Sequence, residues 1–297
     1  MKKFLSLLRT IYVCKNWISA LSVKAGLAEK RAIKFRNGYV FSVEKGTWSE
    51  FQSRVNLFWD FPLASVVNEE LIKTPVMGRE LSFYFGKSGT HILKEVFKNE
   101  AYKPPEGFEI ANRTVVDIGC SYGDSLIYFA WLGAKEVYGF EPQPNLYALA
   151  EKNIAINNVK SAHLIRAGVG GKHGSLFKDS DYYKTEVFES NKDFKYADKN
   201  EDIPLITLED IVKDYKIEKA FMKMDCEGYE YDILLNASDE TLSHFDYIVL
   251  EYHYGYKALG KRLEGAGFKV WHSNPVKSEF ELKGHDKGVG DLTARRI

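Results

Sequence analysis

Short apolar runs with the length of β-strands alternate with longer helical segments through the second half of the chain. The strand-like runs lie at 115–116, 137–140, 162–165, 219–224, 247–250 and 268–271. The segments between them, such as 142–158 and 258–266, carry apolar residues near the 3.6-residue period of an amphipathic helix. Strands that alternate with helices predict an α/β fold: a mainly parallel sheet with right-handed crossovers and helices on both faces. Leu282 and residues 292–294 predict an antiparallel hairpin that closes the sheet.

The first hundred residues show a different pattern. Alternating apolar residues flank Asn37-Gly38, and this dipeptide between such runs predicts a β-hairpin. Further elements are predicted as helices at 47–60 and 91–97 and a strand at 80–85. Pro104-Pro105 interrupts the pattern, because neither a helix nor a central strand accommodates paired prolines. We therefore predict an α+β N-terminal extension, residues 1–105, and a nucleotide-binding domain, residues 106–297.

Residues 170–202 fit the alternation least well. They are polar, first rich in glycine and then in tyrosine and charge, and they predict a hairpin with a mobile insertion. Just beyond them, Thr207 and Asp210 have the spacing of a helix capping box, which predicts the start of a short helix there.

Charge is balanced over the whole chain, with 41 Lys and Arg against 41 Asp and Glu. A dedicated nucleic-acid-binding protein usually has a strong basic excess, so we expect no nucleic-acid partner. Residues 1–36 depart from the balance, because nine basic residues there face a single acid, Glu29. Their apolar run is interrupted by Arg9 and is too short for a membrane span. A basic amphipathic helix of this kind packs on its own domain or a partner, or makes a peripheral contact with an anionic membrane surface.

Three cysteines, Cys14, Cys120 and Cys226, are odd in number and lack the spacing of a metal site. A disulfide framework is not expected, which suits a reducing compartment, and we predict a cytoplasmic location. Cys120 and Cys226 are interpreted as small buried residues near a ligand rather than as nucleophiles.

A glycine turn and an acidic residue carry the strongest functional pattern. Val115-Val116 leads to Asp117, then to Gly119 and Gly123, and a helical apolar pattern follows. The glycines allow close approach of the backbone to a ligand, and the helix N-terminus presents unpaired N–H groups. About twenty residues further on, the next strand ends at Glu141, the position from which a carboxylate accepts hydrogen bonds from a ribose diol. Together the two features predict a nucleotide-type cofactor.

Polar residues also end the later strands. Asp225 and Glu227 follow the run at 219–224, and Glu251 and His253 follow the run at 247–250. Ligands of such sheets bind outside the carboxyl ends of the strands. These side chains are therefore expected to gather with Asp117 and Glu141 along one edge.

The segments 115–125, 139–146 and 221–230 together resemble the FkbM family of S-adenosylmethionine-dependent class I methyltransferases. The most family-specific of these is Lys-Met-Asp-Cys-Glu-Gly-Tyr-Glu at 223–230. The usual Ala-Asn after the first glycine is replaced by Cys120-Ser121. The resemblance covers about residues 114–271 and implies a Rossmann-like fold with a mainly parallel seven-stranded sheet.

The resemblance also implies a cofactor site. Asp117, Gly119, Ser121 and Gly123 would cradle the methionyl part, with Asp117 near its ammonium group, and Glu141 would hold the ribose. The remaining cofactor-binding residues implied are Pro142, Gln143, Ala167 and Asp225.

The family implies O-methylation of a hydroxyl on a small molecule or glycan. A general base accelerates such a transfer, and Asp225 and His253 are the candidates. Alternatively, Asp225, Glu227 and Glu251 are candidates to hold a divalent cation that lowers the pKa of the acceptor.

Two other functions remain open from the residues. A nicotinamide-dependent oxidoreductase would also use Glu141, although Ser121 replaces the second glycine of its Gly-x-Gly-x-x-Gly pattern. A non-catalytic cofactor-binding or scaffold protein would share the fold without turnover.

Overall fold

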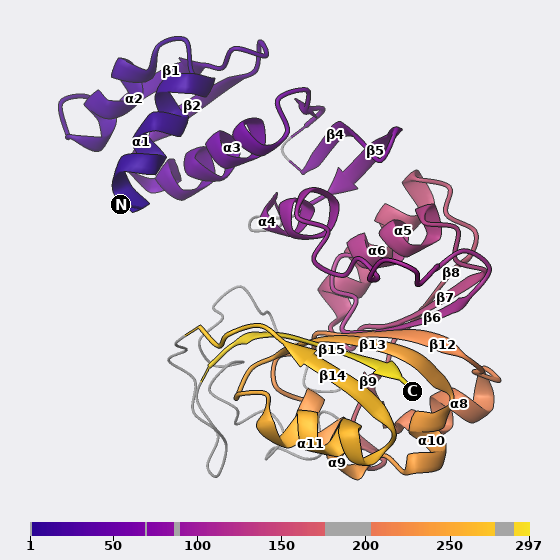
Figure 1. Ribbon diagram of the computed structural model, residues 1–297. Helices are drawn as coiled ribbons and strands as arrows, with labels where there is room; N and C mark the ends of the chain where they lie inside the picture. The colour runs from indigo at the N-terminus through magenta and orange to yellow at the C-terminus, as the bar shows by residue number, and fades with distance from the viewer. Residues whose placement is uncertain (1, 69, 86–89, 176–202, 277–287) are drawn as a thin grey trace. The chain divides into compact units, whose positions relative to one another are not determined.

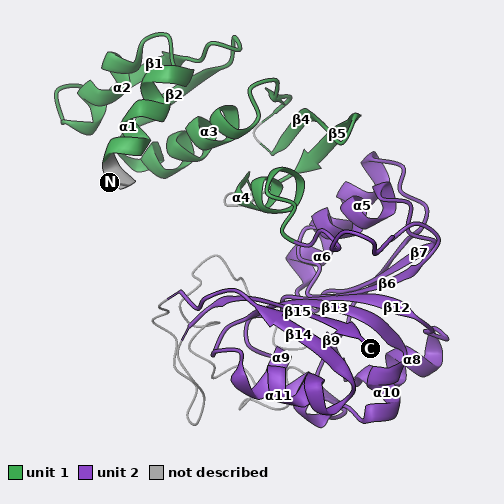
Figure 2. Cartoon of the chain, in the orientation of Figure 1, with its two compact units in different colours: residues 1–101 green, residues 102–297 purple. Residues whose placement is uncertain are grey.

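The computed structural model describes residues 2–68, 70–85, 90–175, 203–276 and 288–297. The chain forms two compact units, Met1–Ala101 and Tyr102–Ile297 (Figure 2). The sequence pattern predicts a boundary after residue 105.

The N-terminal unit begins with α1 (Lys2–Val13) and α2 (Trp17–Lys24), which precede an antiparallel hairpin of β1 (Lys30–Lys34) and β2 (Val40–Glu44). The hairpin predicted at Asn37-Gly38 is confirmed. A short 3-10 turn, η1 (Lys45–Thr47), leads into α3 (Trp48–Asp60), as the aromatic pattern at 47–60 predicts. The hairpin and α3 contribute fully buried side chains to this part: Ile33, Phe35, Val43, Phe51 and Val55.

A three-stranded antiparallel sheet completes this unit. It contains β3 (Ser65–Val66), β4 (Leu71–Val76) and β5 (Arg79–Tyr84), and it is followed by α4 (Thr90–Leu93) and the π-helical turn η2 (Lys94–Lys98). Strand β5 and the following helix match their predicted positions, but β3 and β4 were not predicted. Pro75 lies within β4, where a proline argues against a central strand. It is tolerated because β3 pairs only with Ile72 and Lys73, so the β3 edge is free at Pro75.

A seven-stranded sheet forms the centre of the C-terminal unit (Figure 1). In spatial order its strands are β14 (Phe268–His272), β15 (Gly290–Arg296), β13 (Phe245–Tyr252), β12 (Ala220–Met224), β6 (Thr114–Ile118), β7 (Glu136–Phe140) and β8 (Ala162–Ile165). All neighbouring pairs from β13 to β8 are parallel, and β15 runs antiparallel to both of its neighbours. The predicted mainly parallel, Rossmann-like sheet is confirmed. Residues 292–294 lie in β15, which is antiparallel to β13 and β14. Leu282, the other part of the predicted closing hairpin, lies outside the described residues, so that hairpin stays a prediction.

Helices cover both faces of this sheet (Figure 1). The bounds are α5 (Asp124–Trp131), α6 (Pro144–Ile156), α8 (Leu208–Asp214), α9 (Glu230–Asn236), α10 (Asp239–Ser243) and α11 (Lys257–Gly265). On one face, Phe129 of α5 packs against Phe221 of β12 with ring centroids 5.2 Å apart. On the other face, α8 to α11 bury apolar residues such as Ile233 and Leu263 against the sheet in one continuous core.

A second, three-stranded sheet of β9 (Gly168–Val169), β10 (Gly174–Ser175) and β11 (Pro204–Ile206) adjoins the insertion. Strands β10 and β11 pair antiparallel, while residues 176–202, most of the predicted insertion, lie outside the described residues. The predicted capping box at the start of α8 is present, because Thr207 and Asp210 exchange hydrogen bonds. Within the described ranges, no helix is long and apolar enough to cross a membrane.

Candidate functional site

Strand β6 lies between β7 and β12, and the order in which the chain adds strands to the sheet reverses direction there. Ligands of open α/β sheets bind at such a point, outside the carboxyl ends of the strands. Three residues that end or follow these strands, Asp117, Glu141 and Asp225, therefore belong to one edge of the sheet. The residues Glu251 and His253 at the end of β13 extend the same edge.

The turn after β6 is held close to its neighbours. The backbone N–H groups of Gly119 and Cys120 both donate to the carbonyl of Phe140, at 3.0 and 3.2 Å. A side chain at Gly119 cannot be accommodated, because a Cβ there would lie 2.0 Å from the carbonyl oxygen of Asp225 and the φ angle is +78°. Ser121 also has a positive φ, 47°. The turn is therefore tight, and its backbone contacts the end of β7 and the residue that follows β12.

Glu141 lies at the end of β7, and its carboxylate is buried. One oxygen accepts the N–H of Ser121 at 3.0 Å, and the other accepts the N–H of Gln143 at 2.9 Å. Burial raises the pKa of the Glu141 carboxyl to about 7, although the two N–H donors oppose this increase. The carboxylate is therefore fixed in direction and retains acceptor positions, since two carboxylate oxygens offer about four.

Asp117 is fully buried, and each of its oxygens has a partner within the sheet; its expected place near the ammonium group of a cofactor stays a prediction. The hydroxyl of Ser125 donates to Oδ2, and Nζ of Lys223 lies 3.1 Å from Oδ1. The same Nζ donates to the carbonyl of Gly119 at 2.6 Å. Both side chains are buried, so the pair supports the turn from within the sheet.

Lys223 was not identified from the sequence as a functional residue. Burial alone would lower the pKa of Lys223, but the carboxylates of Asp117 and Asp225 hold it above its ordinary value. Its ammonium group also lies 5.0 Å from the ring centre of Tyr102. The sequence offered one indication of its role. Lys223 interrupts an apolar run that predicts a buried strand, and a buried cation requires an anionic partner.

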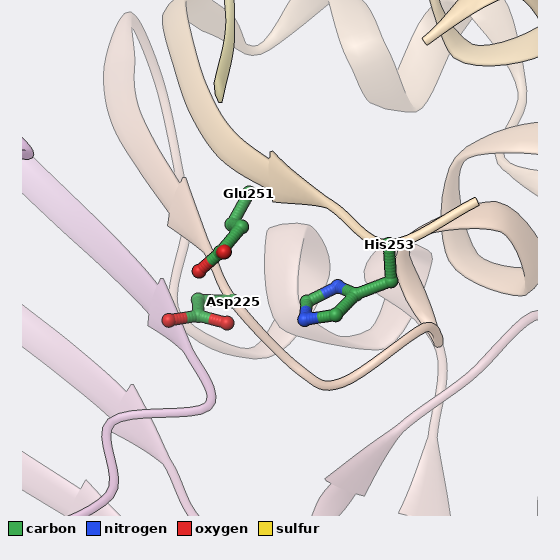
Figure 3. A group of neighbouring side chains, drawn as sticks. All are labelled: Asp225, Glu251 and His253. Carbon is green, nitrogen blue, oxygen red and sulfur yellow. The ribbon is translucent and has the colours of Figure 1, made fainter. Parts of the chain in front are cut away.

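Asp225, Glu251 and His253 form a group of neighbouring side chains, in which Asp225 follows β12 while Glu251 and His253 lie at the end of β13 (Figure 3). One ligand-type atom from each lies within 4.8 Å of the others. The hydroxyl of Tyr102 donates to Oδ2 of Asp225 at 2.9 Å. Glu227, the third predicted metal candidate, is exposed and instead approaches Nε2 of His253 at 3.5 Å.

His253 is buried and paired with a carboxylate that sequence reasoning missed. Nδ1 of His253 lies 3.3 Å from Oε2 of Glu230, and the other oxygen of Glu230 accepts the N–H of Cys226 at 2.8 Å. Burial alone would lower the pKa of His253, but Glu230 and the other nearby carboxylates raise it to about 10. Glu230 was not recognised because it begins helix α9, where an acidic residue usually serves the helix dipole.

The remaining predicted site residues lie near the same edge. Pro142 and Gln143 are partly exposed between β7 and α6, and Ala167 is buried just after β8. Their expected role at an adenine ring stays a prediction. Burial raises the pKa of the thiols of Cys120 and Cys226 well above the ordinary value. This agrees with their interpretation as unreactive residues.

Comparisons with known proteins identify the family to which the chain is similar. A sequence model described as the methyltransferase FkbM domain matches residues 117–270. A protein named Methyltransferase 1 from Beauveria bassiana (strain ARSEF 2860) is 26% identical over 219 residues, which cover 65% of this chain and 86% of that protein.

Two solved structures are similar to parts of the chain. The methyltransferase FkbM from Methylobacillus flagellatus KT is 15% identical, with a TM-score of 0.42, and the match covers 63% of this chain and 44% of that one. The structure of M. jannaschii TYW2 in complex with AdoMet is 18% identical, with a TM-score of 0.40, and covers 78% of this chain and 90% of that one.

Proposed function

Since this chain belongs to the family of FkbM-domain methyltransferases, we propose that it transfers a methyl group from S-adenosylmethionine to a hydroxyl group of a small molecule or glycan. Family membership leaves two points open: the methyl donor and the chemistry of the acceptor.

The buried carboxylate of Glu141 is the observation that carries the choice of cofactor. Its two backbone donors, Ser121 and Gln143, fix its orientation and leave acceptor capacity on both oxygens. A ribose diol presents two O–H donors side by side, which matches this capacity. These acceptor positions therefore fit the ribose of S-adenosylmethionine, and the turn at Gly119 to Gly123 is the candidate to hold the methionyl part.

When bound, the cofactor supplies an activated methyl group on a positively charged sulfur. The chain has to align the acceptor hydroxyl and to take its proton. Alignment alone can contribute about 7–11 kcal/mol toward the barrier. Asp225 and Glu251 provide carboxylate proton acceptors at the ends of β12 and β13, next to His253. The raised pKa of His253 keeps its imidazole protonated near neutral pH, so the carboxylates are the acceptors of the group. A hydroxyl acceptor benefits from such a group, which supports O-methylation.

A divalent cation is a second role for the same group. Three ligand atoms within 4.8 Å of one another favour it, because carboxylate oxygens and imidazole nitrogen are common ligands of divalent metals. Dialysis against a chelator, followed by addition of Mg²⁺, Mn²⁺ or Zn²⁺, distinguishes the two roles. Loss and recovery of activity would assign a cation, and unchanged activity would leave proton transfer alone.

Calorimetric titration with S-adenosylmethionine and its demethylated product tests the cofactor. We expect micromolar binding that Glu141→Ala weakens at least tenfold. Glu136→Ala is the matched control, because Glu136 begins the same strand and pairs with His163 at the surface. Binding of NAD or NADH in place of the sulfonium compound would contradict the proposal.

A screen of acceptors then tests the reaction. Sugars and other hydroxyl compounds are the expected acceptors, and methylation of RNA alone would contradict the assignment. Asp225→Asn separates an enzyme from a non-catalytic cofactor-binding protein. Turnover that is lost while cofactor binding persists would support catalysis, and a wild-type protein that binds cofactor but methylates no acceptor would support the scaffold alternative.

A further inference from the structure

Helix α1 exposes a face that consists of apolar side chains. Phe4, Leu5, Leu8 and Tyr12 are 62, 45, 42 and 61% exposed. At 100° per residue these four positions cover about a quarter of the helix circumference. We call them the apolar stripe. Exposed helix faces are normally polar, and a contiguous apolar patch on a soluble protein marks an interaction surface.

The opposite face of α1 is already used by its own unit. Thr10 and Val13 are buried, and Ser6 donates to Gln52 of α3 at 2.5 Å. The helix is therefore anchored, and the apolar stripe faces away from that anchor. Tyr12 also contacts Trp59 of α3, with ring centroids 5.1 Å apart. Tyrosine and tryptophan together are typical of side chains at a membrane–water interface.

Cations lie beside the apolar stripe and at its C-terminal end. Arg9 lies along its side, with its guanidinium 5.9 Å from the ring centre of Trp59. At the C-terminal end of α1, the N–H of Lys15 donates to the carbonyl of Lys34, and Nε of Arg36 donates to the carbonyl of Tyr12. The side chains of Lys15, Lys34 and Arg36 are exposed. The hairpin β1–β2 lies beside α1 (Figure 1), and these backbone contacts bring Lys34 and Arg36 to the end of the stripe.

We propose that the apolar stripe and these cations dock the protein on the surface of an anionic phospholipid bilayer. Hydrophobic insertion and charge attraction act together in such binding. The charge distribution favours an anionic bilayer as the binding partner, because residues 1–36 carry nine basic residues and one acidic residue while the whole chain is neutral. A second copy of the chain would bring two cationic segments together. The anionic leaflet is the cytoplasmic one, which agrees with the location expected from the cysteines.

Flotation of the full-length protein with lipid vesicles tests the proposal. We expect binding to vesicles of phosphatidylcholine with phosphatidylserine, and little binding to phosphatidylcholine alone. Phe4→Ser/Leu8→Ser should weaken binding at least tenfold. Lys15→Gln/Lys34→Gln should weaken it by roughly 25-fold at low salt, about fivefold for each lysine.

Two matched variants control for nonspecific effects. Leu63→Ser removes an apolar side chain of the same unit that is 78% exposed but lies off α1. Lys160→Gln/Lys261→Gln removes two exposed lysines from outside residues 1–36. Both should bind as the wild type does. Equal binding to neutral and anionic vesicles, or unchanged binding by the stripe variant with native circular dichroism, would overturn the proposal. A dimer in light scattering that the stripe variant abolishes would also overturn it, by assigning the stripe to a second copy.

Discussion

Nζ of Lys223 lies 3.1 Å from Oδ1 of Asp117 in the interior of the sheet, and both side chains are buried. The same ammonium group holds the carbonyl of Gly119, the first glycine of the turn. Strand β12 is thereby tied to the turn after β6 through one cation. The turn that is expected to hold the cofactor thus depends on a charge contributed by a different strand.

Removing this cation should destabilise the fold. Lys223→Met leaves the carboxylate of Asp117 buried without its partner, and breaking one side of a buried pair typically costs about 3–5 kcal/mol. We expect a decrease of that size in the free energy of unfolding in guanidinium chloride. Asp117→Asn/Lys223→Met removes both charges and should recover part of the loss. A single variant within about 1 kcal/mol of the wild type would contradict the importance of the pair.

A methyl group at Gly119 should be disruptive. Gly119→Ala places a Cβ against the carbonyl of Asp225 and imposes a positive φ on a residue that disfavours it. We expect a loss of stability on the order of 3 kcal/mol or more, together with loss of cofactor binding. Gly265→Ala in α11 is the control, because nothing lies within 4 Å of a Cβ there. It should be neutral, or more stable by up to about 1 kcal/mol.

Cofactor binding should strengthen as the pH rises through about 7. The free Glu141 carboxyl has its pKa raised to about 7 by burial, and ribose hydroxyls donate best to the ionised form. The affinity measured by calorimetry should therefore be about tenfold lower at pH 6 than at pH 8. The side chain in Glu141→Gln cannot ionise, so the affinity of this variant should lack the tenfold change between pH 6 and pH 8 that the wild type shows. An identical pH dependence in both proteins would show that Glu141 does not accept these hydrogen bonds.

The stabilising effect of His253 should depend on pH in the opposite sense. Glu230 raises the pKa of His253 from 6.5 to about 10, so the folded protein holds this proton more tightly than the unfolded chain does. The contribution is complete below about pH 6.5 and disappears as the pH rises through about 10. His253→Gln should cost on the order of 3 kcal/mol at pH 6 and much less above pH 10, measured by urea unfolding with a chelator present. A constant difference from wild type at all pH values would argue against the ion pair.

The parallel part of the sheet could be predicted because β7, β12 and β13 are apolar runs that end next to an acidic residue. Parallel strands place those acidic residues at one edge, which is why Glu141, Asp225 and Glu251 could be grouped from the sequence. Helix α8 was predicted from the side-chain chemistry of Thr207 and Asp210, which acts over three residues and is readable locally.

The supporting charges could not be predicted in the same way. Lys223 and Glu230 act through partners that are brought near only by folding, so neither spacing nor periodicity indicates them. Asp117 illustrates the same limit. Its position at the end of β6 predicts a ligand contact, which stays a prediction, whereas its pairing with the buried cation of Lys223 and the hydroxyl of Ser125 could not be read from the sequence. Strand β4 was missed for a local reason, because Pro75 is acceptable there only where the adjacent strand has ended.

The three cysteines, of which Cys14 and Cys120 are buried and Cys226 is partly buried, can report local opening of the chain. Burial raises the pKa of Cys14 to about 12, and those of Cys120 and Cys226 are also well above the ordinary value. The thiolate is the form that reacts with alkylating reagents. Each cysteine therefore becomes reactive when local unfolding exposes it to water and lowers its pKa. Cys14 belongs to one compact unit and the other two to the second. Mass spectrometry can measure the labelling rate of each thiol. The rate for Cys14 and the rates for Cys120 and Cys226 would therefore report the free energies of local opening of the two units, without any engineered probe.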